Sequence, residues 1–251
     1  MRTLGLLLVA FVALSGAVAA QQSAPPPVAT DQQQTLSPAQ QAEIAAGEAN
    51  RERIVTRPRW IDGLALDYPD AERALGHHGE VRVRGLIGVD GRLRYATIEA
   101  SSRAAALDQS ALAYISAATF DPAKDANGAS ISITTTVPVG FYSYTSNQGV
   151  GAAMYTCRQF VLDMDWWRSA FPEKTFADHQ FYLMIRGLGF LARMGQGGGA
   201  LNVESNESFA RRWTQAIETC RAHPERRFAQ AMHPEGDIID RMQRAYEASR
   251  H

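Results

Sequence analysis

The sequence has few cysteines, few lysines and no excess of charge of either sign. Two cysteines occur in 251 residues, and 25 basic residues stand against 26 acidic ones, for a net charge of -1. A balanced charge excludes the broad basic surface that unspecific nucleic-acid binding requires. Lys124 and Lys174 are the only lysines, which we attribute to genome composition rather than to recognition. Hydrophobic residues make up 45% of the chain. We therefore expect a globular protein without a nucleic-acid partner.

Long apolar runs are missing after the first 20 residues. The N-terminus, MRTLGLLLVAFVALSGAVAAQQ, has Arg2, an apolar core from Leu4 to Leu14 and then small residues. This pattern is typical of a signal peptide, and we predict residues 1–20 to be one, with cleavage after Ala20 or one residue earlier. The apolar core is shorter than the roughly 20 residues of a membrane span. We expect a periplasmic mature chain; the alternative is an inner-membrane anchor through residues 4–20.

The two cysteines, Cys157 and Cys220, form the only pair available for a disulfide. Export to an oxidising compartment favours their bridging over two buried free thiols. A catalytic pair would lie much closer along the chain, and a zinc site would need further ligands nearby. We therefore predict a structural disulfide and no metal.

Aromatic residues are absent from residue 21 until Trp60, where Gln, Ala, Pro and Ser dominate. Such a segment buries too little apolar area to offset its ordering entropy, so we predict a flexible linker over residues 21–60. Ser37-Pro38 could begin a short helix that runs through Ala46, with serine as the N-cap.

From Tyr68 onward, helical and strand patterns alternate. The patterns predict a short helix from Pro69 to Gly76, strands at Glu80–Val89 and Arg92–Ala100, a helix that ends at Asp121-Pro122, and a β-branched strand over Ile131–Val139. Asp90-Gly91 is the usual dipeptide of a two-residue type I′ turn between the first two strands. These elements predict an α+β fold, with a small three-stranded antiparallel sheet and two helices.

Residues 61–145 resemble the C-terminal domain of the TonB family of energy transducers. The matching residues are Tyr68-Pro69, Gly79 before EVRV, Asp90-Gly91, Ser101-Ser102, Leu107-Asp108, Ala111, Phe120-Asp121-Pro122-Ala123, Gly128, and Val137-Pro138-Val139 with Phe141. No single match is specific, whereas the whole set in this order and spacing is.

The resemblance implies that the last strand recognises an extended segment of an outer-membrane receptor, or of another envelope protein, by strand addition. Side chains on one face of that strand are the candidate partner-binding residues: Ile131, Ile133, Thr135, Val137 and Val139. The alternative is that this strand only completes the sheet. An exposed edge would also allow a homodimer.

Three departures from the family weigh against coupling to an inner-membrane motor. The N-terminal apolar run carries Ser15 but no histidine, the spacer before the domain is only about forty residues, and the chain continues for about a hundred residues after the last strand.

This extension, residues 150–251, shows apolar stripes at helical spacing. It predicts an all-α, disulfide-bridged domain with helices at about 157–171, 175–194, 208–223 and 224–232, and from 235. The two cysteine-containing helices resemble, over a few residues, periplasmic HdeA-like proteins with one disulfide. A chaperone-like or structural module without energy coupling is therefore the alternative function.

Several tempting motifs do not support an enzyme. GQGGGA at 195–200 is followed by neither Lys-Ser nor Lys-Thr, so it is interpreted as a turn. His77-His78 is interpreted as a pair of exposed loop residues. Asp163 and Asp165, two apart on a helix, are expected on its solvated face beside a buried Trp167. We predict no catalytic residues and no cofactor.

Overall fold

The computed structural model describes residues 36–145, 151–194 and 204–249, all within one compact unit. The predicted signal peptide and its cleavage at Ala20 lie outside these residues. Among the helices that the structure describes, none has the length and apolar character needed to span a membrane.

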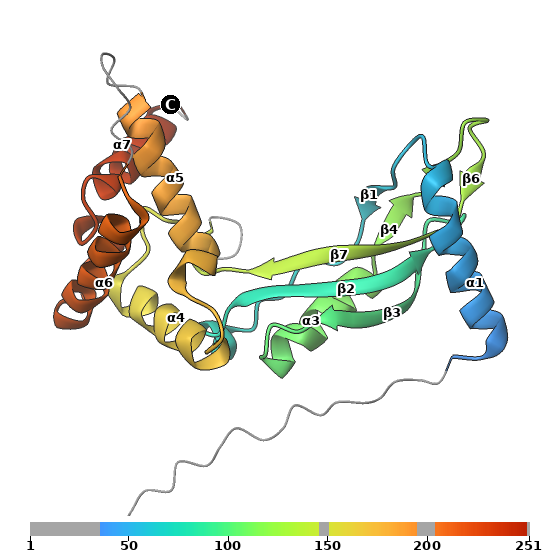
Figure 1. Ribbon diagram of the computed structural model, residues 1–251, viewed down its shortest axis with the longest axis horizontal. Coiled ribbons are helices and arrows are strands. Elements are labelled where there is room, and N and C mark those ends of the chain that lie inside the picture. Colours follow the sequence, from blue (N-terminus) through green and yellow to red (C-terminus); the bar gives the residue numbers. More distant parts are fainter. Residues whose placement is uncertain (1–35, 146–150, 195–203, 250–251) are drawn as a thin grey trace, which may run out of the picture. The chain divides into compact units, whose positions relative to one another are not determined.

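A three-stranded antiparallel sheet forms the first half of the described chain, as predicted (Figure 1). Its strands are β2 (Gly79–Ile87), β3 (Leu93–Ala100) and β7 (Ile133–Phe141), in the order β3-β2-β7. β7 pairs with β2 along its whole length, from Gly79 opposite Phe141 to Ile87 opposite Ile133, without a bulge. The middle strand is therefore β2, and β7 lies at an edge.

Alternate residues of the strands form a core against helix α3 (Ala105–Ser116). Val81 and Val83 are fully buried, and so are Leu107 and Ile115 of the helix. Around this core lie α2 (Asp70–Ala74) and two short strand pairs, β1 (Arg59–Asp62) with β4 (Thr119–Asp121) and β5 (Ala123–Lys124) with β6 (Ser130–Ile131).

The β2–β3 hairpin differs from the predicted two-residue turn. Ile87 pairs with Leu93, and the Gly88 N–H donates to the Arg92 carbonyl at 3.0 Å, so the loop has three residues, 89–91. Gly91 alone in this loop takes a positive φ, +73°. A Cβ at Gly91 would lie 1.9 Å from the Phe120 carbonyl oxygen. Asp-Gly thus marks the turn, while strand register sets its length.

Helix α1 (Pro38–Ala49) packs against the sheet, followed by the 3₁₀ helix η1 (Asn50–Arg53). The predicted Ser37 cap is confirmed by a capping box with Gln40. A Cβ at Gly47 would lie 2.3 Å from Leu86 Cδ1, and Leu86 faces away from the α3 core because its neighbours Val83 and Ile87 point into it. The segment expected to be a flexible linker is therefore packed structure from Pro38 onward, because the sheet supplies the apolar surface that the segment lacks.

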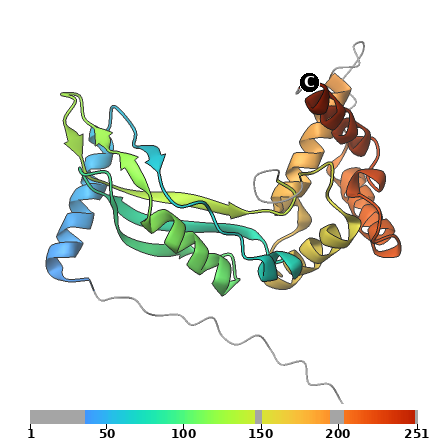
Figure 2. The same ribbon diagram turned by 180° about the vertical axis from the view of Figure 1, so that it is seen from behind.

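The second half of the described chain is helical (Figure 2). Its elements are α4 (Cys157–Ala170), η2 (Phe176–Asp178), α5 (Gln180–Met194), α6 (Asn206–Ala222), η3 (Phe228–Gln230) and α7 (Glu235–Ala248). The helix expected over 224–232 is reduced to η3. The Cys157 N–H donates to the Arg226 carbonyl at 2.7 Å, and the Phe228 N–H donates to the Tyr155 carbonyl at 2.8 Å. The residues after α6 therefore run extended beside the start of α4.

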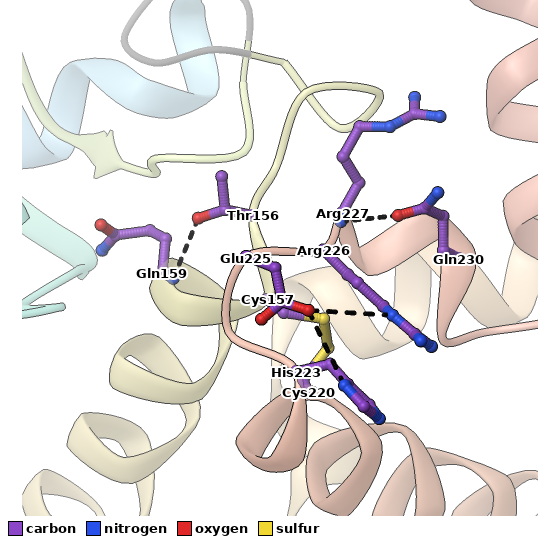
Figure 3. Close-up of a disulfide and its surroundings, with 9 residues drawn as sticks. All are labelled: Thr156, Cys157, Gln159, Cys220, His223, Glu225, Arg226, Arg227 and Gln230. Atoms are coloured by element: carbon purple, nitrogen blue, oxygen red, sulfur yellow. Dashed lines mark hydrogen bonds and ion pairs between the residues drawn. A yellow bond between two sulfur atoms is a disulfide. The ribbon is translucent and has the colours of Figure 1, made fainter.

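The predicted disulfide is confirmed. Cys157 and Cys220 are both fully buried, and their sulfur atoms are 2.01 Å apart (Figure 3). The bond joins the first residue of α4 to the last turn of α6, beside an aromatic core. In that core Phe160 lies edge-on to Trp213, with ring centres 5.3 Å apart. The bridge and the core thus connect the same two helices.

Candidate functional site: the β7 edge and the junction with the helical region

The free side of β7 is the first candidate site. Directly opposed residues of an antiparallel pair alternate between positions that exchange hydrogen bonds and positions that do not. Pro138, opposite Arg82, has no N–H and so occupies a position without exchange. Residues of the same parity, Thr134 and Thr136, therefore direct their backbone groups away from β2. No strand among the described residues pairs with this side.

The predicted partner-binding residues have the opposite parity. Ile133, Thr135, Val137 and Val139 are spaced by two along β7 and turn their backbone groups toward β2. The side chains of Ile133 and Val139 are only 3% exposed, so they belong to the core. Ile131 lies outside β7, in β6, where it pairs with Ala123. Docking at these five residues stays a prediction, and a charge at Ile133 would damage the fold.

The backbone groups that face outward belong to residues that the sequence analysis did not select. Pro138 could have identified them from the sequence. A proline inside a strand occupies a position that donates no hydrogen bond to the neighbouring strand, so residues two positions away along the strand also face outward.

Helix α1 covers the start of the edge. Thr134 Oγ1 donates to the Ile44 carbonyl at 3.0 Å, and Asn50 Nδ2 donates to the Ser132 carbonyl at 3.0 Å. The part of the edge that we treat as uncovered thus runs from Thr136 to Val139. At the usual rise of a strand it is about 14 Å long.

A groove of about 510 Å³ follows this uncovered part. Its lining residues are uncharged, and they come from β7, from the segment after β1 and from α3: Ala65, Leu66, Tyr114, Pro138, Val139, Gly140, Tyr142 and Thr145. Burial raises the pKa of the Tyr142 hydroxyl above its ordinary value, so the hydroxyl stays neutral at physiological pH. The groove therefore suits an uncharged, extended chain segment.

Asp163 of α4 is the centre of a second cluster, where the helical region meets the sheet. Ser143 Oγ donates to its carboxylate at 2.5 Å, Gln159 Nε2 donates at 2.7 Å, and the Tyr155 hydroxyl also donates. Desolvation raises the pKa of Asp163. The expectation of a solvated Asp163 was wrong, because residues 143 and 155 approach α4 from outside the helix. Asp165 is exposed as expected, paired with Arg221.

Replacing Asp163 by alanine should lower the free energy of unfolding by about 3 kcal/mol, because the buried Ser143 and Tyr155 hydroxyls lose their acceptor and the half-buried Gln159 amide loses one of its two. Urea denaturation followed by circular dichroism measures the change. Asp165→Ala is the matched control on the same helix and should change stability by less than about 0.5 kcal/mol. Equal effects of the two substitutions would show that the cluster does not stabilise the junction.

His78, just before β2, also lies at this junction. It is 1% exposed, so the interpretation of His77-His78 as exposed loop residues was wrong for His78. Its ring Nε2 lies 2.7 Å from Nε2 of His179, and its carbonyl accepts a bond from Trp166 Nε1 at 3.1 Å. The half-buried His77 contacts Glu72 at 2.6 Å. The sequence pattern missed this histidine pair because its members are 101 residues apart.

Comparison with protein-family models identifies the first part of the described chain. Residues 65–142 match the model of the Gram-negative bacterial TonB protein C-terminal domain, a span that falls inside the predicted 61–145. A search of curated proteins gave no match for the chain. Within the described ranges, no group of three or more His, Cys, Asp or Glu side chains is placed to hold a metal ion. Residues 65–142 are therefore a TonB C-terminal domain, of a non-enzymatic family of the cell envelope, and the helical region after it is assigned to no family.

Proposed function

We propose that this protein is a periplasmic adaptor that binds an extended segment of an outer-membrane receptor, or of another envelope protein, along the edge of β7. The observation that carries the proposal is the outward-facing backbone of Thr136 and Pro138 beside an uncharged groove. In strand addition, backbone hydrogen bonds provide affinity and the neighbouring pockets select side chains at every second position of the bound segment.

The short uncovered edge also fits a regulated contact rather than aggregation. Long exposed edges recruit other chains indiscriminately, and proteins usually shorten or cover them. Here α1 covers one end of β7, and Pro138 removes one donor from the rest. Few backbone bonds remain for a partner, so we expect binding to be weak and reversible.

Periplasmic location is part of the same proposal. The N-terminal pattern of a signal peptide and the buried disulfide both support an oxidising compartment. The N-terminal apolar run carries no histidine, which weighs against coupling to the inner-membrane motor, and the proposal does not depend on such coupling.

Site-specific photocrosslinking in cells tests the proposal. Benzoylphenylalanine at Thr136 or Pro138 should form adducts with the periplasmic segment of an outer-membrane receptor, identified by mass spectrometry. The control position is Thr97, exposed on β3 at the opposite edge of the same sheet. Receptor adducts at all three positions, or at none, would contradict docking at β7.

The chaperone-like alternative has support from a different surface. Met242 and Tyr246 lie one turn apart on α7 and are 58% and 59% exposed. In the same experiment, a crosslinker at Met242 that captures many unfolded proteins would favour this alternative. Receptor adducts at β7 without such captures would favour the adaptor.

A further inference from the structure

The histidine pair at the junction joins two elements that are far apart in sequence. His78 precedes β2 of the TonB C-terminal domain, and His179 precedes α5 of the helical region. Both side chains are 1% exposed, and their Nε2 atoms are 2.7 Å apart. Two imidazoles at this distance can form a hydrogen bond only if one nitrogen carries a hydrogen and the other does not.

The other ring nitrogens determine which histidine is the donor. His78 Nδ1 lies 2.8 Å from the Gly76 carbonyl, so this nitrogen carries the hydrogen and His78 Nε2 is an acceptor. His179 Nδ1 accepts from the Phe181 N–H at 3.1 Å, so its Nε2 carries the hydrogen. With both rings neutral, all four nitrogens are satisfied and His179 donates to His78.

Protonation of either ring would disrupt one of these hydrogen bonds. A proton on His78 Nε2 would face the N–H of His179 at 2.7 Å. A proton on His179 Nδ1 would face the Phe181 N–H and remove a bond from the start of α5. A buried imidazolium also loses hydration, and the hydrogen bonds described for the two rings include no carboxylate acceptor. Burial, and secondarily His78, place the pKa of His179 well below its ordinary range.

The geometry favours a hydrogen bond over a shared metal ion. A metal at Nε2 would require a lone pair on that atom of His179 and a hydrogen on Nδ1. Nδ1 instead accepts a backbone N–H.

Solvent protons reach the pair through a cavity of about 470 Å³ that both histidines line. The charged residues that line it are Glu80 and Arg82 of β2, Lys174 before η2, and Asp178 of η2. These are two acids and two bases, so they favour neither protonation state strongly.

Two further carboxylates lie behind the pair. Asp163 of α4 interacts with His78, but burial raises the pKa of that carboxyl and so weakens its support for an imidazolium. Glu72 of α2 contacts His77 instead.

We propose that the His78–His179 hydrogen bond is a proton-sensitive latch, which holds the helical region to the TonB C-terminal domain near neutral pH and opens in a mildly acidic medium. The inference does not depend on docking at β7.

The direction of the pH effect follows from the linkage between proton binding and opening of the latch. The pKa of His179 is lower in the closed state than the ordinary 6.5, so the open state binds the proton more readily. The stabilising contribution of the latch is therefore complete above pH 6.5 and is lost progressively as the pH falls below it.

Hydrogen exchange of the Trp166 indole N–H tests the latch in the full mature chain, since this group donates to the His78 carbonyl. From pH 7.5 to pH 5.5, its protection, corrected for intrinsic exchange, should fall by about tenfold, the factor for one proton one unit below 6.5. His179→Gln keeps an amide donor but does not titrate, and should reduce the change to less than about twofold.

His77→Gln is the matched control, because His77 is adjacent but outside the pair, and it should keep the wild-type pH dependence. His78→Gln is the second non-titrating variant if His179→Gln does not fold. The proposal is overturned if wild-type protection is the same at both pH values or if the non-titrating variant keeps the full dependence. A ¹⁵N titration of the wild-type ring that gives a His179 pKa above 6.5 also overturns it.

Discussion

Replacing Thr136 by proline should weaken binding of the receptor segment by about tenfold, with little loss of stability. The substitution removes the outward backbone donor at the start of the uncovered edge and puts the proline ring where the bound chain would lie. One hydrogen bond accounts for about 1 kcal/mol, and the ring adds a steric cost. The fold should tolerate the change because this N–H points away from β2.

Fluorescence anisotropy with a labelled peptide measures this effect, the peptide being the receptor segment identified by crosslinking. Thr136→Val is the matched control, since it has a similar size and keeps the backbone donor. A valine variant as weak as the proline variant would indicate a side-chain contact instead of strand addition. Unchanged binding by the proline variant would rule out the β7 edge.

Loss of the disulfide should destabilise the helical region by about 4 kcal/mol. The two cysteines are separated by 63 residues, and the estimate comes from the chain entropy that a closed loop of that length removes from the unfolded state. The apparent melting temperature should fall by about 10 °C. Differential scanning calorimetry of the Cys157→Ala, Cys220→Ala double variant measures the difference.

A reductant provides the control for this experiment. It should lower the melting temperature of the wild-type protein but not that of the double variant. The core around β2 and α3 is separate from the core around the disulfide, so peptide binding at β7 should persist at temperatures below the transition. Identical melting of the oxidised and reduced wild type would mean that the aromatic core alone holds α4 to α6.

Local patterns predicted the individual elements well. Alternation identified β2, β3 and β7, and apolar stripes identified α4, α5, α6 and α7, because periodicity reflects which face of an element is buried. The Ser37 cap of α1 was also visible. What α1 packs against was not, since Leu86 becomes buried only when a helix covers the second face of the sheet.

The candidate site could be predicted only in part. The strand and the disulfide were found, whereas the residues whose backbone groups face away from β2, Thr136 and Pro138, were not selected. Asp163 and His78 were expected in solvent. Their burial depends on partners 20 and 101 residues away in sequence, Ser143 and His179. A local sequence pattern cannot predict contacts between residues that far apart.

The sequence by itself determined the periodic elements, the turn at Asp90-Gly91, the cysteine pair and the likeness of residues 61–145 to a known domain. These depend on interactions between near neighbours or on the identity of single residues. Tertiary structure alone decided that α1 covers part of β7, that the helical region is joined to the sheet through buried polar groups, and which backbone groups stay available. Those outcomes depend on which surfaces meet, and burial changes both the hydrogen bonding and the protonation of the groups between them.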